Sequence, residues 1–147
     1  MRFMMLMIPN VYQSKGDGGK AKAGFVPDAE SVKLMMKYNE ELAKAGALIA
    51  LDGLHPDSMG ARVALKGGKP SVTDGPFTES KEVIGGYWLI QAASKEEAVE
   101  WAKRCPIQEG DTIEVRQVFE MSDFPPEARQ AAEKSIVREQ LERQKHA

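Results

Sequence analysis

The sequence has few of the residues that build disulfide, thiolate or imidazole sites. It contains one cysteine, Cys105, and two histidines, His55 and His146. A single cysteine cannot form an intramolecular disulfide, which favours a reducing, cytoplasmic location. His146 stands next to the last position, where chains are usually poorly ordered. His55 is therefore the candidate for titration near neutral pH.

An excess of charge of one sign and long apolar runs are also missing. Twenty Lys and Arg oppose 22 Asp and Glu in 147 residues, without the basic patch typical of nucleic-acid binding. The apolar stretch of residues 3–9 is much shorter than the roughly 18 residues of a membrane helix and lacks a cleavage pattern after it. We expect no nucleic-acid or membrane partner, and we interpret this stretch as a buried strand in a single compact domain.

Two helices have recognisable ends. The first is predicted over residues 28–45, with an aspartate as N-cap and Gly46 at the position after the C-cap. The second begins with a capping box of Ser94 and Glu97 and ends before Pro106. The buried stripe of the first helix is predicted to consist of Ser31, Met35, Tyr38, Leu42 and Ala45.

Short apolar runs and alternating patterns predict the strands. Residues 60–73 read as a hairpin whose turn is Gly67-Gly68-Lys69, and the continuous apolar run of residues 83–92 is typical of a central strand. A single tail helix with a thin apolar stripe of Ala128, Ala132, Ile136 and Leu141 is expected after Pro125. The remaining strands are expected at residues 3–9, 47–54 and 112–119.

This order of elements predicts an α+β fold. It corresponds to a ferredoxin-like βαββαβ arrangement with an inserted hairpin and a C-terminal helical extension. We place the domain at residues 1–122 and the tail at residues 123–147. Both helices then cover one face of the sheet, and a second copy of the chain is expected to cover the other, which predicts a homodimer.

The side chains able to do chemistry gather in two loops, which we expect to meet at one end of the sheet. His55 follows the second strand and precedes Pro56, which holds it extended. In the loop of residues 74–82, Asp74 and Glu79 are candidate carboxylates for fixing the His55 tautomer, so that the imidazole transfers a proton as a catalytic base or acid. The candidate ligand-binding residues are Asp52, Lys81, Tyr87 and Trp88.

Each of these residues also has a purely structural interpretation. Asp74 begins an Asp-Gly-Pro turn, where its side chain bonds its own backbone, and a histidine before proline is often a surface residue. Glu79 and Lys81 are typical solvated charges. Tyr87 and Trp88 are adjacent in a strand and face opposite sides of the sheet, so one of them belongs to the core or to a dimer contact.

Metal and thiol chemistry are the weaker alternatives. Asp52, His55 and Asp57 form a poor ligand set without a second histidine or a thiolate, and we expect no metal and no cofactor. Cys105 lies at a helix C-terminus, where the helix dipole disfavours a thiolate. It is predicted to be a core residue.

Residues 74–82 (DGPFTESKE), running into residues 85–88 (GGYW), resemble the hallmark of DGPF-domain proteins, the YCII-related family. Residues 37–42, 53–56 and 97–106 extend the resemblance over about the first 120 residues. The resemblance implies membership of the dimeric α/β-barrel proteins, relatives of muconolactone isomerase and other small acid–base enzymes.

What the resemblance implies about activity is limited. In YCII proteins proper, a histidine on the first helix and a nearby aspartate are suggested as the active pair, but here Met35 occupies that position. The hypothesis is therefore that the protein binds a small organic molecule and transfers a proton through His55, as in an isomerase or lyase. The alternative is a non-catalytic binding or regulatory module. Some DGPF proteins are encoded beside extracytoplasmic-function sigma factors, which suggests such a factor as a partner.

Overall fold

The computed structural model describes residues 1–13, 24–77 and 82–145. The chain divides into two compact units, Met1–Gln117 and Val118–Ala147. The first unit carries the sheet, two helices and the hairpin, and the second is helical.

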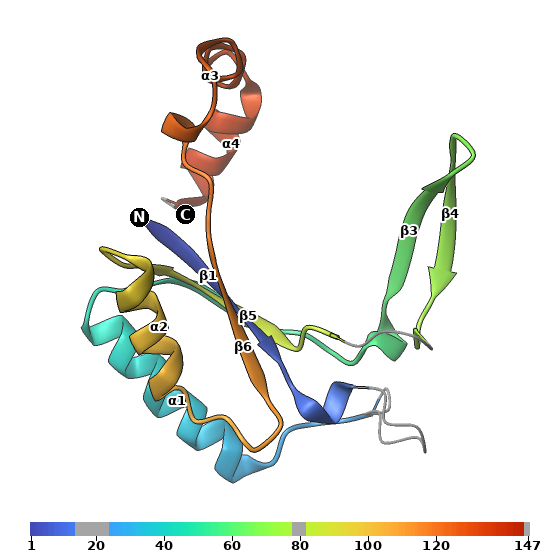
Figure 1. Ribbon diagram of the computed structural model, residues 1–147, viewed down its shortest axis with the longest axis vertical. Helices are drawn as coiled ribbons and strands as arrows, with labels where there is room; N and C mark the ends of the chain where they lie inside the picture. The colour runs from blue at the N-terminus through green and yellow to red at the C-terminus, as the bar shows by residue number, and fades with distance from the viewer. Residues whose placement is uncertain (14–23, 78–81, 146–147) are drawn as a thin grey trace. The chain divides into compact units, whose positions relative to one another are not determined.

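The first unit has the ferredoxin-like α+β arrangement expected from the sequence. Its main sheet is antiparallel, in the order β2-β5-β1-β6, and α1 and α2 lie on the same side of it (Figure 1). Within one chain this sheet is open and does not close into a barrel. Its elements are β1 (Arg2–Ile8), α1 (Ala29–Lys44), β2 (Leu48–Gly53), β3 (Ala61–Lys66), β4 (Lys69–Asp74), β5 (Gly86–Gln91), α2 (Lys95–Arg104) and β6 (Thr112–Gln117).

The core lies between the sheet and the two helices. Alternate residues of the central strands β1 and β5 point into it, as the period of a β-strand requires. The Tyr38 hydroxyl donates a hydrogen bond of 2.7 Å to the backbone oxygen of Trp101, and the Tyr38 ring meets Trp88 edge to face. The cluster comprises Phe3, Met5, Tyr38, Leu42, Ala47, Trp88, Ile90, Ala92, Ala98, Trp101 and Cys105.

The predicted helix ends are confirmed. Asp28 caps α1 by accepting a hydrogen bond from Ser31 N, and Ser94 caps α2 by accepting from Glu97 N. The Glu97 carboxylate accepts from the Ala93 amide, so the return bond of the capping box reaches one residue further back than predicted. Ala45, predicted to be buried, is exposed because it is the C-cap, where the chain leaves the helix.

The predicted strand of residues 83–92 starts later than expected, at Gly86. The backbone of Val83 pairs with the side chain of Gln13 and not with a neighbouring strand. Gln13 Oε1 accepts a hydrogen bond from Val83 N, and Gln13 Nε2 donates one to Val83 O. As predicted, β5 is a central strand. The last predicted strand also stops early, because its ladder with β1 ends at the Phe3–Gln117 pair.

The inserted hairpin forms a separate two-stranded sheet of β3 and β4 (Figure 1). Its turn is shorter than predicted, because Lys69 pairs with Lys66 and only Gly67 and Gly68 remain unpaired. Both have positive φ, 56° and 78°, as a two-residue type I′ turn requires. One face of the hairpin is apolar and 66–75% exposed at Val63, Leu65 and Val72.

Up to residue 145, the second unit forms two short helices instead of the single tail helix predicted. These are α3 (Pro126–Glu133) and α4 (Ile136–Lys145). The break falls at Ser135, whose hydroxyl accepts a hydrogen bond from Val137 N, and serine side chains favour helix starts over helix interiors. Of the predicted stripe, Ile136 and Leu141 are exposed.

Candidate functional site

The Asp-Gly-Pro-Phe segment, which begins at the last residue of β4, is bound to the short 3-10 turn Asp57–Met59 that follows β2. Gly75 N donates to Gly60 O at 2.8 Å, and Phe77 N donates to Asp57 Oδ2 at 3.0 Å. A Cβ atom on Gly75 would overlap the Asp57 carbonyl oxygen. The motif that carries the family resemblance therefore joins two loops in the structure.

A second set of hydrogen bonds comes from the turn after β1. Tyr12 in the 3-10 turn Asn10–Tyr12 donates its hydroxyl to Leu54 O at 2.8 Å. Leu54 N in turn donates to Gly85 O at 2.9 Å, next to the segment held by Gln13. Sequence reasoning missed Tyr12 and Gln13, because their partners lie 42 and 70 residues away and no local pattern marks them.

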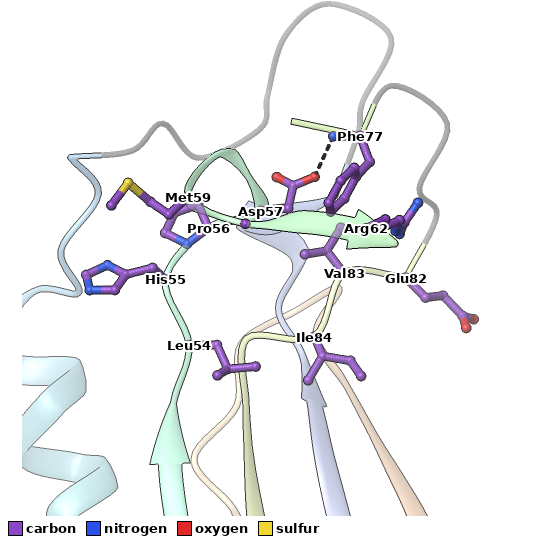
Figure 2. A pocket seen from close by; sticks show the side chains of 11 residues that line it. Leu54, His55, Pro56, Asp57, Met59, Arg62, Phe77, Glu82, Val83 and Ile84 are labelled. Atoms are coloured by element: carbon purple, nitrogen blue, oxygen red, sulfur yellow. Dashed lines mark hydrogen bonds between the residues drawn. The ribbon is translucent and has the colours of Figure 1, made fainter. Parts of the chain in front are cut away.

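The two loops border an open pocket of about 420 Å³ at this end of the sheet (Figure 2). The loop after β2 and the loop before β5 therefore meet, as the sequence predicted. Figure 2 shows His55 and Met59 on one side of the pocket and Arg62 and Glu82 on the other. The lining residues are Leu54, His55, Pro56, Asp57, Met59, Gly60, Arg62, Phe77, Glu82, Val83 and Ile84.

His55 lines this pocket without a bond to Asp74, one of its two predicted carboxylate partners. The His55 side chain is exposed, and among the described residues none has a hydrogen bond or ion pair with it. Asp74 is exposed at the end of β4 and is not part of the lining. Glu79 and Lys81 lie outside the described residues. Among the described residues, the carboxylates that line the same pocket as His55 are those of Asp57 and Glu82.

Asp52 and Tyr87 lie close together on adjacent strands. The Tyr87 hydroxyl donates a hydrogen bond of 2.7 Å to Asp52 Oδ2, and this bond is the main cause that raises the pKa of Tyr87. The phenol is thereby held in its protonated form. Trp88 points to the opposite face, as predicted, where its Nε1 donates to Asn39 Oδ1 inside the helix-covered core. Neither aromatic side chain lines the pocket.

Within the described ranges, no group of three His, Cys, Asp or Glu side chains is arranged to hold a metal ion. The weak alternative set of Asp52, His55 and Asp57 does not form such a group, and Asp57 is 8% exposed and bound to Phe77 N. In the same part of the chain, no helix combines the length and the hydropathy that crossing a bilayer requires.

Cys105 is buried in the core, as predicted. Burial, and to a smaller extent the charge of Asp111, raises the pKa of the Cys105 thiol from its ordinary value of 9.0 to about 12. Between pH 9.0 and about 12, the unfolded chain releases the thiol proton while the folded protein keeps it. Stability from this group is therefore complete below pH 9.0 and is lost as the pH rises towards 12.

We expect the free energy of unfolding to decrease as the pH is raised from about 8 to about 11. Urea unfolding followed by circular dichroism at several pH values measures it. The Cys105→Val variant, which lacks the thiol, should show a shallower decrease. Equal slopes for the two proteins would contradict the assignment to Cys105.

Known proteins match parts of this sequence. Residues 1–122 match the YCII-related domain family. An uncharacterized protein of Rhizobium meliloti (strain 1021) is 32% identical over 76 residues, which are 52% of this chain. The match covers 61% of that relative. The family match spans the sheet, both of its helices and both loops of the pocket, and the chain belongs to the YCII-related domain family.

Proposed function

We propose that this protein binds a small organic molecule in the pocket between the loop after β2 and the loop before β5. The observation that carries the proposal is the pocket itself, which at about 420 Å³ has the size of small-molecule sites. Its lining is mainly apolar and includes Leu54, Val83 and Ile84, with few polar groups around them. This combination is typical of sites that bury an apolar body and orient it through a few polar contacts.

The walls of the pocket are held by contacts that need no ligand. The hydrogen bond from Phe77 N to Asp57 fixes one loop, and the two bonds between Gln13 and Val83 fix the other. A site that is ordered before binding loses less conformational entropy when the ligand enters. These contacts therefore support a binding role for this end of the sheet.

Proton transfer by His55 is the finer form of the proposal. The imidazole lies in the lining, where a bound molecule would contact it, and neutral imidazole offers both a donor and an acceptor. Its tautomer would then be set by the ligand, because no described carboxylate bonds to it. Replacing His55 with asparagine should retain binding and abolish any turnover. Turnover that persists in this variant would exclude the catalytic role.

The binding proposal is tested by a fragment panel of neutral, anionic and cationic compounds, followed by amide chemical shifts in solution. We expect the changes in amide chemical shift on binding to concentrate at Leu54, Val83 and Ile84. Ile84→Trp should fill the pocket and remove them, whereas Ile107→Trp, on an exposed residue outside the lining, should leave them unchanged. Absence of binding across the panel, or binding that survives in Ile84→Trp, would overturn the proposal.

We also propose that a second copy of the chain covers the face of the sheet opposite the helices. Because Phe3 and Met5 enter the core, the alternating residues Met4 and Leu6 point to the other face. Leu89 pairs with Met4 there, and all three are only half-buried. The β6 residues opposite Leu6 and Met4 are Glu114 and Arg116. An apolar centre flanked by both signs of charge is self-complementary under two-fold symmetry.

Leu6→Glu should therefore convert a dimer into a monomer, because it places a charge at the centre of the apolar face. Light scattering after gel filtration measures the mass, and circular dichroism checks that the variant is folded. Leu34→Glu, on an exposed residue of α1, should remain dimeric. A wild-type protein with the mass of one chain would contradict the proposed dimer.

A further inference from the structure

Among the charged side chains that line the pocket, Arg62 lies over an aromatic ring. Its guanidinium carbon lies 4.0 Å from the centre of the Phe77 ring, in a cation–π contact. Phe77 is itself held by the hydrogen bond from its backbone to Asp57. The guanidinium is therefore positioned by a residue of the Asp-Gly-Pro-Phe segment.

The hydrogen-bond donors of Arg62 have no acceptor in residues 1–13, 24–77 and 82–145, because neither an ion pair nor a hydrogen bond joins its guanidinium to them. A guanidinium has five N–H donors in its plane. The ring offers no hydrogen-bond acceptor oxygen, so the cation–π contact leaves donors of the guanidinium available for the two oxygens of a carboxylate. Arg62 thus lines the pocket as an ordered cation with unused donors.

We infer that the pocket binds an organic monocarboxylate, with its carboxylate on Arg62 and its apolar body against Leu54, Val83 and Ile84. This inference rests on the proposed binding function of the pocket and adds the class of its ligand. Figure 2 shows the guanidinium of Arg62 and the carboxylate of Glu82 pointing in different directions, so Glu82 does not occupy the place of the ligand carboxylate.

Two features decide between a monoanion and other charged ligands. Asp57 and Glu82 place two carboxylates in the lining, and their repulsion disfavours a dianion such as a phosphate ester. Outside the pocket, the hairpin carries positive charge. Lys66 and Lys69 pair with each other at its end and share a face of the hairpin with Arg62. A basic face leading to the site favours the approach of an anion.

The test compares acids with their neutral amides of nearly equal shape. The probes are phenylacetate and phenylacetamide, benzoate and benzamide, and hexanoate and hexanamide, with binding measured by the shifts of the pocket amides. We expect at least one acid to bind the wild-type protein about tenfold more tightly than its amide, as charge-assisted hydrogen bonds predict. The Arg62→Gln variant should lose this preference. Arg62→Lys should recover only part of it, because an ammonium lacks the planar fork.

Arg104→Gln is the matched control. Arg104 is stacked on Trp101 at 3.7 Å in the same kind of contact but lies outside the pocket lining, so its loss should leave the preference for acids intact. Amides that bind as tightly as acids, or a preference that survives in Arg62→Gln, would overturn the inference and leave the binding function standing. If neither probes nor fragments bind, the proposed function itself fails.

Discussion

Gly75→Ala should destabilise the first unit by about 3 kcal/mol or more, as overlap in a packed site does. The added methyl group would overlap the Asp57 carbonyl oxygen and also approach the Gly60 oxygen to 3.2 Å. Both are backbone atoms, which cannot move aside as the end of a flexible side chain would. The segment would have to separate from the Asp57–Met59 turn and lose the bond from Gly75 N to Gly60 O.

Urea unfolding followed by circular dichroism measures this loss, and amide spectra show whether Asp57 and Phe77 change with it. Gly60→Ala is the matched control on the other loop of this contact, because its nearest contact would be an ordinary 3.5 Å and its φ of −117° suits any residue. A Gly75→Ala protein as stable as Gly60→Ala would show that the two loops are not joined in this way.

Leu42→Ala should reduce the free energy of unfolding by about 2–5 kcal/mol. Leu42 is 0% exposed and lies in the core between α1 and the sheet. The substitution removes buried apolar atoms and leaves a cavity that the surrounding side chains fill only in part. The expected loss is a large part of the stability of a small domain.

Leu34→Ala, made on the same helix, separates this effect from helix propensity. Leu34 is 56% exposed, so its truncation should change the free energy of unfolding by less than about 1 kcal/mol. Urea unfolding of both variants and of the wild-type protein gives the comparison. Equal losses at the two positions would contradict the placement of Leu42 in the core.

The elements that sequence reasoning predicted well are those whose signals are local. Asp28 and Ser94 cap helices through bonds to residues three positions further along, and the glycines of the hairpin turn allow positive φ. The prediction fails where the local conformation depends on a residue far away in the sequence. The segment beginning at Val83 has strand-like composition, but the side chain of Gln13 binds it and replaces a strand partner.

The sequence predicted where the candidate site lies, but not the hydrogen bonds that hold it together. The order of elements brought the loop of His55 and the segment after β4 to one end of the sheet, where His55, Phe77 and Glu82 line the pocket. The bonds of Asp57 to Phe77 and of Tyr12 to Leu54 were missed. Each joins a side chain to a backbone group 20 or 42 residues away, which composition and periodicity do not encode.

The two tryptophans of the chain, Trp88 and Trp101, both lie in the core that the helices cover. Indole emission is sensitive to the polarity of its surroundings. Fluorescence excited at the long-wavelength edge of the protein absorption, where tryptophan absorbs, therefore reports on the interior of the first unit. Neither ring lines the pocket, so a ligand bound there would not touch them. The natural chromophores of this protein thus separate defects of the interior from events at the end of the sheet, without any added dye.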